Sequence, residues 1–150
     1  MKKYCLIFLF IWLIIIFLLS AMPSSESGKQ SKLLLKDTIN IVNKISNNKL
    51  SSLDNNVINK LHKPFRKLMH IFVYFILSIL FLISLKNSKY NIYIITIILC
   101  IIYAISDEYH QSMVVGRCAR LLDVYIDSIG VLFGCFIYYL YTNIKSLLKY

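Results

Sequence analysis

One stretch of this 150-residue chain gathers side chains that could do chemistry. The segment "SDEYHQSMVVGRCARLLDVYIDSIG", residues 106–130, holds four of the seven acidic residues, and apolar runs lie on both sides of it. Carboxylates, an imidazole and guanidinium groups in one segment can act as general acids and bases, bind an anion, or together hold a divalent metal.

The candidate residues divide by the chemistry of their side chains. The candidates for acid–base catalysis are His70, Asp107, Glu108 and Asp123. The candidates for ligand contact are Arg66, Tyr74, His110, Gln111, Arg117 and Asp127. A structural alternative stays open, in which these side chains form an ion-paired polar end that closes a helix bundle. No serine or cysteine is evident with a paired base, so covalent catalysis is not supported.

The composition places the chain among membrane proteins. Hydrophobic residues make up 58% of it and occur in long unbroken runs, whereas a soluble domain of this length would alternate apolar and polar residues. There are 17 Lys+Arg against 7 Asp+Glu. Because the basic residues stand beside apolar runs, this excess favours anionic lipid headgroups as partners and not nucleic acid.

The apolar runs predict an all-α membrane protein with four transmembrane helices in a single domain over residues 1–150. A bilayer core needs about 20 apolar residues of helix. The first run could instead be a signal peptide, with a cleavage site at Ser20–Ala21. In the last run, Gly130 and Gly134 form a GxxxG pair that lets another helix approach closely. The expected spans are about 4–22, 68–85, 90–106 and 124–141.

The polar region 23–67 opens with a turn-rich exit and then predicts two amphipathic helices, at 31–45 and 51–65. Both have apolar residues at helical spacing and lysines on the other face, which is typical of helices in the membrane interface. Ser51 or Ser52 is a plausible N-cap for the second helix, and Pro64 is expected to end it. The alternative is a loosely ordered loop.

Four spans alternate in direction, so their connections fall on two sides of the membrane. The region 23–67 and the segment 107–123 then share one side, together with the start of the second span and His70. Asp123 and Asp127 are four residues apart and share a helix face, where two carboxylates repel unless a cation or a proton lies between them. The charged groups are therefore expected to converge at one end of the bundle.

Two blocks of the sequence, "FRKLMHIFVYFILS" and "YAISDEYHQSMVVGRCARLLDVYIDSIGVLFG", resemble the VanZ-like family of small bacterial membrane proteins. The first block matches the family pattern at Arg66, Lys67, His70 and Tyr74. The second block matches it at Asp107, Glu108, His110, Gln111, Gly116, Arg117, Asp123, Val124, Asp127, Gly130 and Gly134. Two positions depart from the pattern: Val73, where many members have Glu, and Val115, where many have Pro.

The resemblance implies a link to glycopeptide (teicoplanin) resistance and a place in the bacterial cytoplasmic membrane. Arginine and carboxylates beside lipid suit a ligand with an anionic head and an apolar tail, such as a lipoglycopeptide or a lipid-linked cell-wall precursor. Two functions are open: binding of such a ligand, or a membrane-embedded enzyme that modifies a lipid or cell-wall precursor, with or without a divalent metal.

Overall fold

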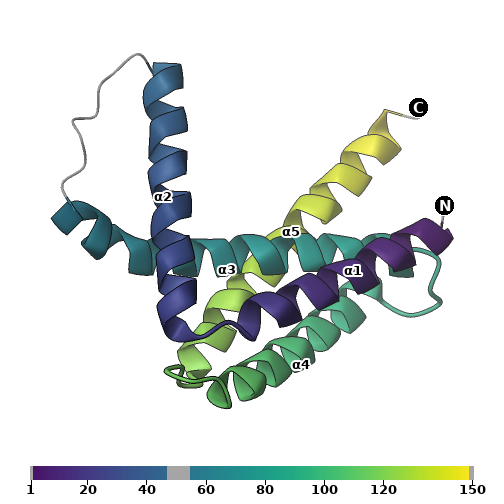
Figure 1. The fold of residues 1–150 in the computed structure, drawn as a ribbon. Helices are drawn as coiled ribbons and strands as arrows, with labels where there is room; N and C mark the ends of the chain where they lie inside the picture. Colours follow the sequence, from purple (N-terminus) through teal and green to yellow (C-terminus); the bar gives the residue numbers. More distant parts are fainter. Residues whose placement is uncertain (1, 47–54, 149–150) are drawn as a thin grey trace.

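The computed structural model describes residues 2–46 and 55–148, and within them it has five α-helices and no strand. This confirms the all-α class that the sequence predicts. α3 is the central helix, because each of the other four packs against it (Figure 1). In chain order the helices are α1 (Lys2–Ser20), α2 (Ser24–Ser46), α3 (Asn55–Leu85), α4 (Ile92–Ser112) and α5 (Leu121–Leu147).

Three helices are long and apolar enough to cross a membrane: Ile58–Leu85 of α3, then α4 and α5. Their outward faces expose large apolar side chains such as Ile94, Ile102 and Leu132, as expected where a helix faces lipid. α1 and α2 pass the same test only as one pair, bent by 113° between them. The described chain thus has three candidate spans, or four if the bent pair is one span.

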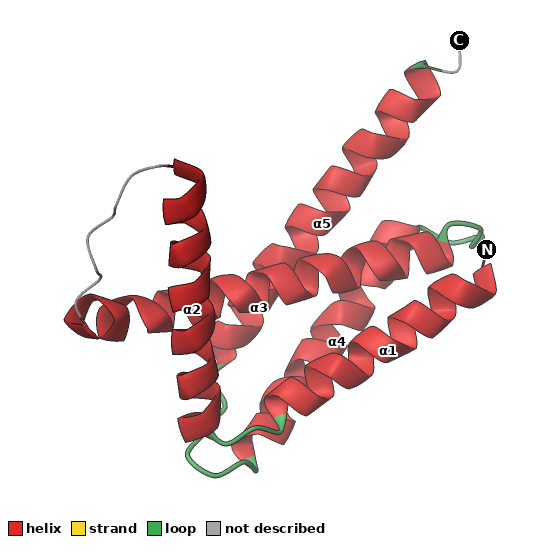
Figure 2. Cartoon of the chain, turned by 45° about the horizontal axis from the view of Figure 1, so that its top comes forward, coloured by secondary structure: helices red, strands yellow, loops and turns green. Residues whose placement is uncertain are grey.

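α2 stands across the other helices, and Figures 1 and 2 show it projecting away from α1 after the bend. It begins at Ser24, where a turn-rich exit was expected, because the Pro23 carbonyl accepts the N–H groups of Glu26 and Ser27 at 3.1 and 3.0 Å and so starts the first turn. Its Leu35 is buried, whereas Ile41 and other apolar residues of the helix are exposed.

The prediction that Pro64 ends a helix is wrong, since α3 continues through Pro64 to Leu85. Proline removes one backbone donor, which leaves the Lys60 carbonyl without its usual partner. Both residues are exposed, so that carbonyl is accessible to water and the helix tolerates the interruption. Residues 51–54, with the expected N-cap at Ser51 or Ser52, lie outside the described residues.

The last two helices are longer than the sequence suggested. α4 runs to Ser112 and α5 begins at Leu121, so the expected polar loop 107–123 is reduced to the connection 113–120. Asp107, Glu108 and Gln111 are buried on the last turns of α4. Their polar groups are hydrogen-bonded at the bundle end. These bonds lower the free-energy cost of burying polar side chains, so the helix can continue through these residues.

Gly130 and Gly134 allow α5 to lie directly against the backbone of α3. A Cβ atom added to Gly130 would collide with the carbonyl oxygen of Ile71. A Cβ atom at Gly134 would collide with the Ser78 hydroxyl and stand 2.9 Å from the Phe75 carbonyl oxygen. The expected close approach at the GxxxG pair is therefore present, and its partner is α3.

Replacing Gly130 by alanine should lower the free energy of unfolding by about 1–3 kcal/mol, because the new methyl group meets backbone that cannot rotate away. Thermal unfolding of the purified protein in detergent would measure this. Gly28→Ala is the matched control, since nothing lies within 4 Å of the added Cβ on α2. A Gly130→Ala protein as stable as wild type would contradict the close contact.

Candidate functional site

The ionisable candidates from three helices meet at one end of the bundle. His70 comes from α3, Asp107 from the last turns of α4, and Asp127 from the first turns of α5. The N-terminal half of α3, the end of α4 and the start of α5 lie near the α1–α2 junction (Figure 1). The structure thus brings together residues that are far apart in the sequence.

His70 and Asp127 form an ion pair across the contact between α3 and α5. The His70 Nδ1 atom lies 3.4 Å from Asp127 Oδ1, and the Asp127 side chain is 0% exposed against 25% for His70. Both Asp127 oxygens are buried without a hydrogen-bond partner in the described structure, so the pair is a charge contact and not a hydrogen bond. A buried carboxylate behind an imidazole fixes the orientation of the ring.

Gln111 connects three parts of the chain through its amide group. Its Nε2 donates to Asp107 Oδ2 at 2.8 Å and to the hydroxyl of Ser20 at 3.3 Å. Its Oε1 accepts a hydrogen bond of 2.7 Å from Arg117. The amide therefore ties the end of α4 to the end of α1 and to the connection 113–120, as a hydrogen-bonded polar network can.

Arg117 also closes the C-terminal end of α1. Its second guanidinium nitrogen, Nη2, donates to the Leu19 carbonyl at 3.2 Å, one of the last four carbonyls of a helix that lack intrahelical donors. Gly116 makes the preceding turn with a φ of 75°, which favours glycine. Burial lowers the pKa of Arg117, and the neighbouring Arg66 lowers it further, although an arginine stays charged at neutral pH.

Glu108 and His110 have structural contacts and line neither of the two cavities described below. The Glu108 carboxylate accepts the backbone N–H of Arg120 at 2.9 Å and so holds the connection at the start of α5. His110 stacks on Phe17, with ring centroids 4.3 Å apart and planes 10° apart. The partners of these two candidates are thus a backbone N–H and an aromatic ring.

An apolar cavity of about 140 Å³ lies between α1, α2 and α3. Its apolar lining includes Ile16, Leu34, Met69 and Val73, while Tyr74 and Asp107 bring polar groups to it. The Tyr74 side chain is 1% exposed, and its hydroxyl has no hydrogen-bond partner in the described structure. This cavity suits an apolar chain that carries a polar group at one end.

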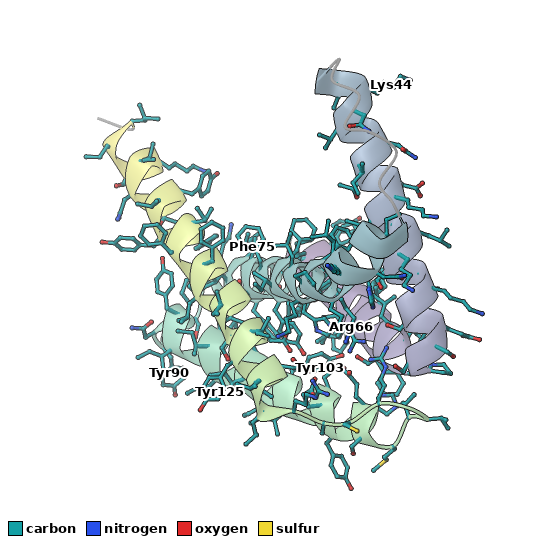
Figure 3. The ribbon with its side chains drawn as sticks, turned by 90° about the vertical axis from the view of Figure 1, so that its left-hand side faces the viewer. Lys44, Arg66, Phe75, Tyr90, Tyr103 and Tyr125 are labelled. Carbon is teal, nitrogen blue, oxygen red and sulfur yellow. The ribbon has the colours of Figure 1, made fainter. Side chains whose placement is uncertain are left out.

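A larger, basic cavity of about 330 Å³ adjoins the first. The two cavities share three lining residues, Arg66, His70 and Arg117. Figure 3 shows Arg66 among the side chains between the helices, whereas Lys44 stands at the free end of α2. The charged and imidazole side chains that line the basic cavity are His62, Lys63, Arg66, Lys67, His70, Arg117, Arg120 and Asp123.

Several lining residues were not among the sequence candidates. His62, Lys63 and Lys67 continue the stripe of Arg66 and His70 along α3, at spacings that repeat with the turn of a helix. The expected break at Pro64 separated His62 and Lys63 from Arg66, whereas Lys67 stands with Arg66 and His70 in the family pattern. Ser27, Gln30 and Ser31 of α2 line the apolar cavity, and only the bend between α1 and α2 places them there.

The described residues contain no group of three or more His, Cys, Asp or Glu side chains arranged to hold a metal ion. Asp127 and His70 are close to each other, but a site that holds a metal with protein ligands alone generally needs at least three of them. The divalent metal considered from the sequence therefore gains no support from these residues.

The fold and the site define the class: an all-helical chain with the character of a multi-pass membrane protein and with its buried carboxylates gathered at one end. The model of the VanZ/LLP1 family matches residues 5–142. The chain belongs to this family, which confirms the resemblance seen in its two sequence blocks. Comparisons with curated proteins and with solved structures found no match.

The His70–Asp127 pair should be measurable as an energetic coupling. His70→Gln and Asp127→Asn should each lower the free energy of unfolding by about 1–3 kcal/mol, because each leaves the other partner buried and less well paired. The double variant should lose less than the two single losses combined. Chemical unfolding in detergent would measure the cycle, with Ser128→Ala as control, since the Ser128 hydroxyl bonds within α5 to Val124. Strict additivity would show that the two side chains do not interact.

Proposed function

We propose that this VanZ-family protein binds an amphiphilic, anionic ligand of the bacterial cell envelope at one membrane face, and that this binding contributes to teicoplanin resistance. The observation that carries the proposal is the pair of adjoining cavities, one apolar and one basic, that share Arg66, His70 and Arg117. A lipoglycopeptide and a lipid-linked precursor both have an anionic part joined to an apolar chain.

The arrangement of the two cavities suits a ligand that stays partly in the membrane. The apolar cavity has α2 on one side and the membrane-crossing α3 on another, so a lipid chain could enter without leaving the bilayer. The basic cavity lies at the polar end of α3, where Lys63 and Lys67 are exposed and can attract anions. Both halves of an amphiphile are thus accommodated at once.

The membrane topology of this proposal has four spans, with α1 as the first. Trp12 on α1 donates to the Val73 carbonyl at 3.1 Å, and Tyr103 on α4 donates to the Leu13 carbonyl at 2.7 Å, which are the kind of polar contacts that hold membrane helices together. α2 then lies along the interface, since it turns 113° away from α1 and exposes both lysines and apolar residues. The site faces the outside, where teicoplanin acts.

Expression of the wild-type protein in a teicoplanin-sensitive host should reduce teicoplanin susceptibility more than vancomycin susceptibility, because vancomycin lacks the lipid chain. Arg66→Gln should remove most of the protection, since it takes a shared charge from both cavities. Lys86 is exposed and follows α3 at the other end of the bundle. The Lys86→Gln variant should therefore protect like wild type. Measurements would be compared at equal protein levels in the membrane. Equal protection by wild type, Arg66→Gln and Lys86→Gln would show that the charge of Arg66 plays no part in resistance.

An enzyme that modifies a lipid or a cell-wall precursor is the second candidate, and the His70–Asp127 pair favours it. His70 lines both cavities and has a buried carboxylate at 3.4 Å, an arrangement in which an imidazole can act as a general base at the point where head and tail of a ligand would meet. Asp107 and Asp123 line the apolar and the basic cavity respectively.

Mass spectrometry of envelope lipids separates the two candidates. If the protein is an enzyme, expression of wild type should change the mass of a lipid species, and His70→Gln should abolish that change at equal abundance. If it only binds, the lipid masses should be the same with either protein. Identical lipid profiles for wild type and an empty vector would therefore exclude the enzyme in that host.

A further inference from the structure

The basic cavity carries more positive charge than a single carboxylate head would need. Its lining has five lysine and arginine side chains against one carboxylate, Asp123, with two histidines in addition. Like charges gathered in a partly enclosed space repel one another unless an anion offsets them. The charge count therefore indicates a ligand with several negative charges.

Three nearby carboxylates, Asp107, Glu108 and Asp127, offset only part of this charge, because none of them lines the basic cavity. Asp107 accepts from Gln111 and lines the apolar cavity. Glu108 accepts the backbone N–H of Arg120 and is 5% exposed. Asp127 is fully buried beside His70. These three acids thus lie outside the basic cavity, whereas Lys63 and Lys67 line it from exposed positions on α3.

Two donors that line the apolar cavity also lack partners among the described residues. The Arg117 Nε atom is buried without a hydrogen-bond partner, and so is the Tyr74 hydroxyl. Both residues line the apolar cavity, and Arg117 lines the basic one as well. Arg66 lowers the pKa of Arg117, because the two guanidinium groups are close enough to repel. An acceptor with several oxygens placed between them would satisfy both charges and donors.

We infer that the basic cavity binds the diphosphate head of a lipid whose chain occupies the apolar cavity. This inference rests on the proposed function and names the chemical class of its ligand. A phosphate monoester carries about −1.5 to −2 charge at pH 7 and three acceptor oxygens, and a second phosphoryl group adds to both. A phosphodiester or carboxylate head carries one charge and leaves most of the lining cations unpaired.

The test is binding of four probes to the full-length protein in detergent: farnesyl diphosphate, farnesyl phosphate, farnesoic acid and inorganic pyrophosphate. Trp12 is the single tryptophan, and it contacts the carbonyl of Val73, which lines the apolar cavity. Its fluorescence should therefore report the entry of a farnesyl chain, and pyrophosphate is tested by competition. We expect farnesyl diphosphate to bind about tenfold or more tightly than farnesoic acid, as added charge-assisted hydrogen bonds would give.

Lys63→Gln and Arg66→Gln should each weaken farnesyl diphosphate severalfold and change farnesoic acid less, because they remove charge that only the diphosphate uses fully. Lys63 is exposed, so its variant should keep the wild-type melting temperature. Lys86→Gln is the charge-matched control away from the cavity and should bind all probes like wild type.

The outcomes separate the inference from the proposed function. Equal affinity for the diphosphate and the carboxylate would overturn the diphosphate inference and leave an amphiphile-binding protein. Competition by pyrophosphate as strong as farnesyl diphosphate would overturn the lipid part, because the anion alone would then supply the affinity. No response to any farnesyl probe would overturn both.

Discussion

The contact between α5 and the backbone of α3 is the constraint on which the rest of the structure depends. Gly130 leaves room for the Ile71 carbonyl, and Asp127 lies three residues earlier on the same face of α5. The close approach therefore carries the Asp127 carboxylate into full burial opposite His70. A larger side chain at Gly130 would push the helices apart and open the pair. The close packing of the two helices and the His70–Asp127 pair therefore depend on each other. His70 also lines both cavities.

At the polar end of the bundle, most of the acidic side chains are buried and the basic side chains line a cavity. Asp107, Glu108 and Gln111 are nearly fully buried. Asp107 accepts from Gln111 within α4, while Glu108 and Gln111 bond to the connection 113–120, so the three stabilise the end of α4 in an apolar surrounding. The lysines and arginines are longer, and their side chains reach from exposed or half-buried positions into open space. Residues that are mixed in the sequence are thus separated in space, with buried acids and an amide beneath a basic surface.

Much of this could be predicted from the sequence, for definite physical reasons. Long apolar runs and the GxxxG pair predict membrane helices and a close approach at Gly130, since both depend on local composition. The family resemblance rested on residues such as His70 and Asp127, which the structure places 3.4 Å apart. Pro64 was misleading because its effect depends on whether the freed carbonyl is accessible, which is a tertiary property. The two cavities could not be predicted, because they depend on the bend before Ser24.

The bond from Arg117 to the Leu19 carbonyl joins residues that are 98 positions apart, and this has a consequence for biosynthesis. α1 leaves the ribosome early, but the group that closes its C-terminal end is made only after most of the chain. At about 5–20 residues per second, that interval is roughly 5 to 20 s. During this time α1 lacks its final partner. The last third of the chain therefore completes the capping of the first helix, whose contacts with Val73 and Tyr103 use residues made earlier.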